Sequence, residues 1–171
     1  MEQVVLVDDD GNEIGTMAKE KAHQAPGHLH RAFSVFLRDP SGRLLMQRRA
    51  FEKYHFPGVW ANACCSHPRP GEPLSEAARR RVREELGLDS EPTEIGTFTY
   101  RASDPVSGLV EHELDHVFTT IVSEDPDPDP SEVMEWRWIE ADELRARVNA
   151  ADPTLAPWVS AAVRAFPELV G

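Results

Sequence analysis

Three short segments carry side chains that could bind a metal ion or move protons. They are GHLHRAF at 27–33, CCSHP at 64–68 and EHE at 111–113. In an extended strand, residues i and i+2 point to the same face, so residues two positions apart can serve one site. On this pattern the pairs are His28 with His30, Cys65 with His67, and Glu111 with Glu113.

The imidazoles and carboxylates of these segments form a mixed nitrogen and oxygen donor set. Such a set suits a borderline divalent ion such as zinc or manganese. His23 lies shortly upstream of the first segment and could join it. Each histidine taken alone is better explained as an ordinary surface or core residue, so it is the combination that favours a metal site.

The chain has two cysteines, Cys64 and Cys65, and they are adjacent. A disulfide between neighbours would be strained, because bridged residues prefer Cα atoms about 5.5 Å apart. We therefore expect reduced thiols. Strand alternation puts the two side chains on opposite faces, so only Cys65 can share a site with His67, and we expect Cys64 to pack behind the sheet as a small apolar residue.

The length of 171 residues predicts one domain spanning 1–171, large enough to bury roughly 70% of its unfolded surface. No apolar run approaches the ~20 residues of a membrane span and no signal peptide is recognisable, so a cytoplasmic protein is expected. The 30 acidic and 18 basic residues, with net charge −12, argue against nucleic acid or an anionic membrane as partner. An anionic small substrate would need a local basic cluster or bound cations.

The elements that must position these residues begin with two predicted hairpins. VVLVDDDGNEIGT is the first, and HLHRAFSVFLRDPSGRLLMQRRA is the second, with strands to about Leu37 and from Arg43 to Arg49. LSEAARRRVREEL at 74–86 predicts a helix, and Gly87 is its natural stop.

The second half of the chain predicts further strands and two late helices. EIGTFTYRAS and LVEHELDHVFTTIV indicate strands, WRWIEADELRARV a strand and then a helix, and LAPWVSAAVRAF a final helix. SEDPDPDPSE at 123–132 predicts a solvated connection that does not pack. The order of elements indicates the α+β class.

SHPRPGEPLSEAARRRVREELGL resembles the Nudix box, a loop–helix–loop signature whose glutamates hold magnesium against a diphosphate. The resemblance implies a Nudix-type mixed β-sheet sandwiched by helices. Two positions depart from the box, since Ser66 stands where glycine is usual and Arg81 where a second glutamate is usual. The loss of that glutamate argues against hydrolysis by a metal-activated water. The positions that match are Glu72, Arg80, Val82, Glu84, Glu85, Gly87 and Leu88.

Longer pieces resemble one branch of that superfamily, the type 1 isopentenyl-diphosphate delta-isomerases. The resemblance runs over nearly the whole chain, from VVLVDDDGNEIGT to APWV. The matching pieces are HLHRAFSVFL, RRAFEKYHFPGVWANACCSHPRPGE, REELG, YRASDP, GLVEHELDHVF, EVMEWRW and PW. The family isomerises isopentenyl diphosphate to dimethylallyl diphosphate in isoprenoid precursor biosynthesis, so the resemblance implies a small isoprenoid diphosphate as substrate and a monomeric enzyme.

The resemblance also implies roles for individual residues. Cys65 would be the catalytic cysteine, Glu113 its partner across the substrate, and Tyr100 a hydrogen-bond partner of that carboxylate. Glu85 would hold a Mg²⁺ that also touches the diphosphate. One Mn²⁺ or Zn²⁺ would be bound by His23, His30, His67, Glu111 and Glu113. The substrate would be contacted by Lys19, Arg49, Lys53, Ser66, Arg81 and Trp158.

These residue types suit the reaction that the family performs, which adds a proton at one end of an alkene and removes another from the allylic carbon. A neighbouring metal or cation is expected to lower the pKa of Cys65. Trp158 offers an aromatic face to a carbocation, worth on the order of 2 kcal/mol when desolvated. Two alternatives stay open, a Nudix diphosphate hydrolase and a metal-stabilised binding domain without turnover.

Overall fold

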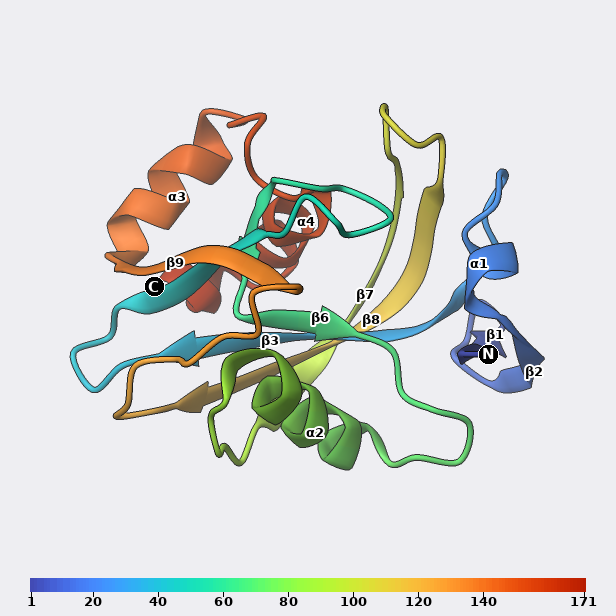
Figure 1. The fold of residues 1–171 in the computed structure, drawn as a ribbon, viewed down its shortest axis with the longest axis horizontal. Helices are drawn as coiled ribbons and strands as arrows, with labels where there is room; N and C mark the ends of the chain where they lie inside the picture. The colour runs from blue at the N-terminus through green and yellow to red at the C-terminus, as the bar shows by residue number, and fades with distance from the viewer.

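The computed structural model describes residues 1–171, and both predicted N-terminal hairpins are present (Figure 1). β1 (Gln3–Val7) pairs antiparallel with β2 (Glu13–Ala18), and β3 (His30–Arg38) pairs antiparallel with β4 (Leu44–Arg49). A short helix, α1 (Lys19–Ala22), connects the two hairpins.

The remaining strands extend the same sheet. β8 runs parallel to β3, whereas the other strand pairings are antiparallel, so the sheet is mixed as predicted. The additional strands are β5 (Trp60–Asn62), β6 (Cys64–Ser66), β7 (Thr93–Ser103), β8 (Val110–Ile121) and β9 (Val133–Ile139).

The predicted central helix is α2 (Leu74–Leu86), with the bounds expected from the sequence. Its apolar positions Ala77, Ala78, Val82 and Leu86 are buried. Gly87 ends it in the left-handed region at φ 65°, and its N–H donates to the Arg83 carbonyl at 2.9 Å. A residue with a side chain would be strained at that φ, so this glycine fixes the end of the helix.

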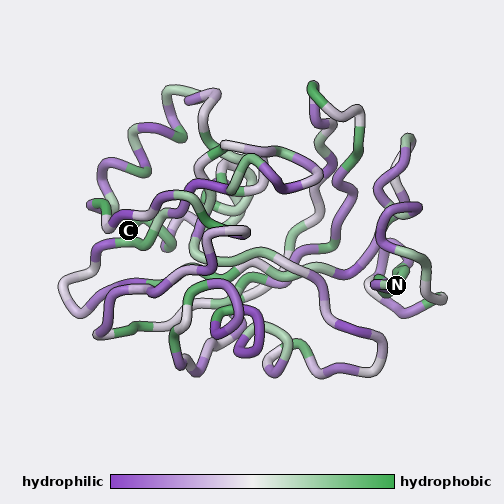
Figure 2. The backbone as a smooth tube through the Cα atoms, in the orientation of Figure 1, coloured by the Kyte–Doolittle hydropathy of each residue, from purple (hydrophilic) through white to green (hydrophobic).

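Three further helical segments follow β9: α3 (Ala141–Asn149), α4 (Pro157–Ala165) and the 3₁₀ turn η1 (Pro167–Val170). In Figure 1, α2 covers one face of the sheet, while α3 and α4 lie on the other side. Figure 2 shows that α2 and α3 carry much hydrophilic sequence, whereas α4 is largely apolar. None of the helices has the length and apolar character needed to cross a membrane.

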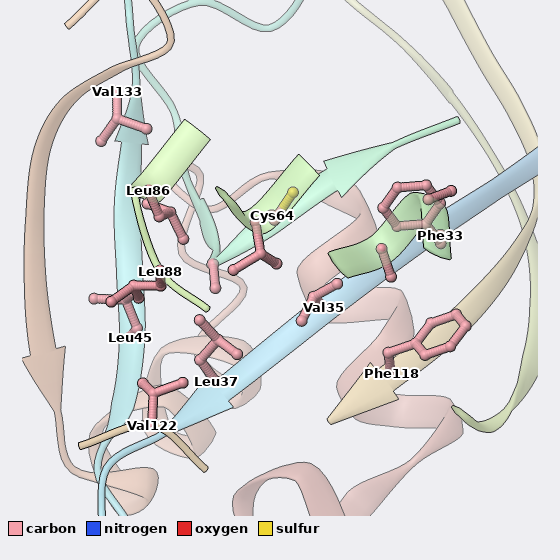
Figure 3. Packing of buried hydrophobic residues seen from close by; sticks show 14 residues of the cluster. Phe33, Val35, Leu37, Leu45, Cys64, Leu86, Leu88, Phe118, Val122 and Val133 are labelled. Carbon is pink, nitrogen blue, oxygen red and sulfur yellow. The ribbon is translucent and has the colours of Figure 1, made fainter. Parts of the chain in front are cut away.

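Two apolar clusters fill the space on either side of the sheet. Phe33, Val35 and Leu37, which alternate along β3, pack with Cys64 and Leu86 in the cluster beneath α2 (Figure 3). The second cluster is formed by other side chains, among them Leu44, Met46, Leu144, Trp158 and Val159. The prediction of an α+β fold with a mixed sheet between helices is therefore confirmed.

The acidic segment 123–132 is largely exposed as predicted, but contrary to the prediction it also packs against the end of α2. The Asp127 N–H donates to the Leu86 carbonyl at 2.8 Å, and the Asp129 N–H donates to the Glu85 carbonyl at 3.0 Å. The last carbonyls of a helix have no partner within it, so a passing backbone can satisfy them. This requirement holds the segment in place despite its composition.

Candidate active site

A cavity of about 150 Å³ gathers side chains that are far apart in the sequence. It combines a thiol, several carboxylates, imidazoles, cationic side chains and aromatic rings. The residues that line it are Glu2, Lys19, Phe33, Arg49, Lys53, His55, Cys65, Ser66, His67, Arg81, Tyr100, Glu111, Glu113, Asp115, Glu132 and Trp158. All of the side chains proposed for catalysis and substrate contact therefore reach one cavity.

Strand register brings the acid–base candidates together. Glu113 on β8 lies opposite His30 across the parallel pair with β3, and opposite Tyr100 across the antiparallel pair with β7. The Tyr100 hydroxyl donates a hydrogen bond to Glu113. Cys65 on β6 lies opposite Ser34 on β3. The carboxylate and the thiol thus come from two strands that flank the same central strand.

The predicted separation of the two cysteines is confirmed. Cys64 is completely buried in the cluster under α2, whereas Cys65 lines the cavity, and both thiols are free. The Cys65 Sγ–H donates to Asn62 Oδ1 at 2.9 Å, and Ser34 Oγ lies 3.6 Å from the same sulfur. Each thiol therefore has a distinct environment: Cys64 packs among apolar side chains close to the Glu85 carboxyl group, and Cys65 faces the polar cavity.

The protonation of Cys65 differs from the sequence expectation. Burial raises the pKa of the Cys65 thiol, and the nearby Asp115 carboxyl group raises it further. The Arg49 guanidinium acts in the opposite direction but is outweighed. The neighbouring cation therefore does not lower this pKa in the metal-free protein, in which Cys65 holds its proton.

Asn62 connects Cys65 with the aromatic wall of the cavity. Its Oδ1 also accepts a hydrogen bond from Trp158 Nε1 at 3.1 Å. Its amide nitrogen donates to the carbonyls of Val35 and Cys64 at 2.8 and 3.0 Å, which fixes the orientation of the amide. One buried side chain thus holds both the thiol and the indole.

The five residues proposed as metal ligands lie together. Their donor atoms are all within 4.8 Å of one another, and all five residues are buried. His23 Nε2 and Glu111 Oε2 lie 3.3 Å apart, and neither has a hydrogen-bond partner. Unpaired buried polar atoms are costly, and a shared cation would satisfy both. The donor set therefore fits a divalent ion. Its members are His23, His30, His67, Glu111 and Glu113.

The buried charges of this cluster influence one another. Burial lowers the pKa of His67 to about 4, so its imidazole is neutral and can act as a ligand. Burial and the neighbouring Glu111 oppose ionisation of Glu113, but contacts from His30 and His67 bring the pKa of Glu113 below its usual value. Glu113 is thus a carboxylate in the resting protein.

The pairing of His28 with His30 predicted by alternation is wrong. β3 begins at His30, so strand alternation does not extend back to His28, whose side chain is exposed. The His28 carbonyl nevertheless accepts a hydrogen bond from His30 Nδ1 at 2.8 Å, which leaves His30 Nε2 directed at the cluster. His23, at the end of α1, occupies the place that spacing alone assigned to His28.

The four proposed phosphate contacts form a cationic region of the cavity wall. Lys19 pairs with Glu2 at 3.1 Å, Lys53 pairs with Glu132, and Arg81 pairs with Glu85. The remaining one is Arg49, which donates to two backbone carbonyls and lies 5.3 Å from the Trp158 ring. In the free protein, three of these four cationic side chains are thus ion-paired with carboxylates.

Glu85 itself is buried beside Arg81 and does not line the cavity. Burial raises the pKa of Glu85, and the Arg81 guanidinium opposes that rise. Arg81 stands where the Nudix box usually has a glutamate, and its guanidinium group pairs with the Glu85 carboxyl group.

Several residues at the site were not predicted. Asp115 lies two positions beyond Glu113, so strand alternation extended along EHELD would have found it. Glu132 belongs to the acidic segment that was expected to be solvated. No periodic pattern marks the others. They are Ser34, Tyr54, His55 and Asn62.

Comparison with known proteins identifies close sequence relatives. The NUDIX domain family model matches residues 28–159. An isopentenyl-diphosphate Delta-isomerase of Streptomyces griseus is 57% identical over 143 residues, covering 83% of this chain and 73% of the relative. Another protein of that name, from Nocardia farcinica, is 48% identical over 157 residues, covering 92% of this chain and 90% of the relative.

Solved structures share the fold at low sequence identity. A Deinococcus radiodurans protein superposes with a TM-score of 0.75 at 21% identity, covering 96% of this chain and 99% of its own. The MutT protein of Methanosarcina mazei has a TM-score of 0.68 at 20% identity, covering 82% of this chain and 94% of its own. These similarities establish the architecture, while the sequence relatives indicate the family.

Proposed function

The chain belongs to the isopentenyl-diphosphate Delta-isomerase family of NUDIX-domain proteins, and from this premise we propose how its cavity isomerises isopentenyl diphosphate to dimethylallyl diphosphate. The observation that carries the proposal is that Cys65 and Glu113, from separate strands, both line the cavity. One group holds a proton and the other is ionised. This is the pairing that a proton addition and removal requires.

In the proposed reaction, one residue of the pair protonates the terminal alkene carbon and the other removes a proton from the allylic carbon. The double bond moves by one position and no group leaves the molecule. Because the reaction is reversible, Cys65 and Glu113 each donate in one direction and accept in the other. Tyr100 orients the Glu113 carboxylate through its hydrogen bond.

The intermediate state has the character of a tertiary carbocation, which water would capture. Trp158 is buried in the wall of the cavity, with the Phe56 ring packed edge-on 5.5 Å away. An indole face attracts a cation through its quadrupole and excludes water at the same time. We propose that Trp158 covers the isoprenyl tail.

The histidine and glutamate cluster would hold one Mn²⁺ or Zn²⁺, and such an ion would polarise the Glu113 carboxyl group and hold it in place. Its ligands would be His23, His30, His67, Glu111 and Glu113. Glu85 would hold a Mg²⁺ that enters with the diphosphate. Mixed imidazole and carboxylate donors suit Mn²⁺ or Zn²⁺ at the first site, and a single carboxylate that acts together with phosphate oxygens suits Mg²⁺ at the second.

The diphosphate would be received by the cationic side chains of the cavity. Its oxygens would replace the carboxylates that now pair with Lys19, Lys53 and Arg81. Arg49 and the backbone near Ser66 would complete the contacts. On the strength of the family resemblance, we also propose that residues 1–171 act as a single domain and as a monomer. The two free thiols favour the cytoplasm, and the net charge of −12 disfavours nucleic acid and membrane partners.

The decisive experiment incubates the purified protein with Mg²⁺ and isopentenyl diphosphate in deuterated water and follows the products by proton NMR. We expect dimethylallyl diphosphate with deuterium incorporated. Release of inorganic phosphate or a monophosphate would indicate a hydrolase instead. Unchanged substrate would indicate a binding domain. The matched control is Cys65→Ala, which should bind metal and fold but produce no isomer.

A further inference from the structure

The segment 51–58 between β4 and β5 contacts the proposed metal ligands from outside the cluster. Figure 1 shows it extending toward the β7–β8 hairpin, where the Phe56 N–H donates to Asp104 Oδ2 at 3.0 Å. The Arg49 side chain holds the same segment from β4, by donating to the carbonyls of His55 and Phe56 at 3.1 and 3.2 Å. The backbone at 55–56 is therefore anchored on two sides.

Two adjacent side chains of this segment each contact a different metal ligand. The Tyr54 hydroxyl hydrogen bonds with His23 Nδ1, and His55 Nε2 contacts Glu111 Oε1. In both cases the contacted atom is the second polar atom of the side chain, on His23 the other ring nitrogen and on Glu111 the other carboxylate oxygen. His23 Nε2 and Glu111 Oε2, the two unpaired atoms, remain directed at each other.

The chemistry of the ligands determines the direction of these hydrogen bonds. A neutral histidine that ligates through Nε2 carries its proton on Nδ1, so His23 donates to the Tyr54 oxygen. The Glu111 carboxylate can only accept, so His55 donates from Nε2. His55 Nδ1 has no partner, which agrees with a proton on Nε2. Together the contacts leave one lone pair of His23 and one oxygen of Glu111 for an ion.

We propose that Tyr54 and His55 are positioning residues of the metal centre, Tyr54 fixing the tautomer of His23 and His55 holding Glu111 in one-oxygen coordination. The inference rests on the metal site proposed above. Lys53 precedes them directly and lines the cavity with Arg49. The same anchored segment thus joins the diphosphate contacts to the metal ligands.

The test measures Zn²⁺ affinity by competition with a chromophoric chelator, and the visible absorption spectrum of the Co²⁺-loaded protein. Tyr54→Phe and His55→Leu are expected to weaken Zn²⁺ binding about 10–100-fold, the usual effect of losing a partner of a ligand. Both should also change the Co²⁺ spectrum. His55→Gln retains an N–H donor near the position of Nε2, so it should restore most of the affinity.

Two control variants separate the possible outcomes. Glu52→Gln alters an exposed side chain of the same segment that makes no hydrogen bond, and it should bind Zn²⁺ normally. His30→Ala removes a proposed ligand and should weaken binding whatever Tyr54 and His55 do. Thermal unfolding of each metal-free variant shows whether its fold persists, and Tyr54→Phe, which loses one oxygen, provides the test if His55→Leu does not fold.

Unchanged Zn²⁺ affinity in folded Tyr54→Phe and His55→Leu, with weakened binding in His30→Ala, would overturn the positioning roles and leave the metal site in place. If His55→Gln loses as much affinity as His55→Leu, His55 is itself a ligand and its positioning role is wrong. Unchanged binding in His30→Ala would overturn the metal site and the positioning roles together.

Discussion

Cys64 and Cys65 are neighbours in the chain, but they belong to two regions with opposite chemistry. Cys64 lies in an apolar cluster with Leu86 and Val35, where buried hydrophobic side chains pack against one another. Cys65 lies in a cavity that contains buried atoms without partners, among them Asp115 Oδ1 and Glu111 Oε2. The apolar region stabilises the fold, while the cavity keeps polar groups available for a ligand.

The same substitution at the two positions tests this difference most directly. Cys65→Ser is expected to reduce kcat about 10²–10⁴-fold, because a hydroxyl is a much weaker acid than a thiol and proton transfer contributes that much. Its thermal stability should change little. The measurement is NMR detection of dimethylallyl diphosphate at saturating substrate. Normal turnover by this variant would contradict the assignment of Cys65.

Asn62 lies at the boundary between the regions, since its amide touches both sides. Asn62→Ala removes the acceptor shared by Cys65 and Trp158, and a displacement of about 1 Å in such groups can cost about 10²-fold in rate. We expect kcat to fall by that order, with KM affected less. The alkylation rate of Cys65 should change in parallel. A normal rate of isomerisation would show that Asn62 has only a packing role.

Cys64→Ser should affect stability and leave the reaction intact. The more polar hydroxyl would replace a fully buried thiol that packs among apolar side chains, and a buried polar group without its full set of hydrogen bonds costs about 1–3 kcal/mol. Chemical denaturation measures the loss of free energy of unfolding, and activity per folded molecule should match that of the unchanged protein. A large loss of kcat here would remove the distinction between the two thiols.

The last prediction concerns the pH dependence that His67 in the cavity adds to the stability of the metal-free protein. The pKa of His67 falls from its ordinary 6.5 to about 4 on folding. Between these two pH values His67 is therefore protonated in the unfolded chain and neutral in the folded protein. Stability of the metal-free protein should therefore fall as pH decreases from about 6.5 to 4. The raised pKa of His30 acts in the opposite direction.

The contribution of His67 is isolated by comparing His67→Gln with the unchanged protein, both treated with a chelator. Denaturation across this pH range should show a shallower decline for the variant. Parallel curves would mean that His67 does not titrate as the buried geometry indicates. Cys64→Ser, altered in the apolar region, should keep the original slope.

Local patterns in the sequence determined the elements and the faces of their side chains. The helix 74–86 with its glycine stop, the hairpins, and the separation of Cys64 from Cys65 all follow from periodicity, because neighbouring residues are constrained by backbone geometry. The same alternation correctly paired Glu111 with Glu113. Most of the candidate residues that came from family resemblance line one cavity, while His23, His30 and Glu85 lie outside its lining, and their roles are predictions that the experiments above test.

Only the tertiary structure decided which distant groups meet. Spacing alone favoured His28, but His23, which the family resemblance had named, joins the cluster because β3 begins at His30. The acidic segment packs against α2 because the end of that helix leaves carbonyls without partners. In the metal-free protein, burial outweighs the nearby cation and raises the pKa of Cys65. Contacts from loops, such as those of Tyr54 and His55, follow no period. They depend on how the chain closes in three dimensions, so spacing along the sequence could not reveal them.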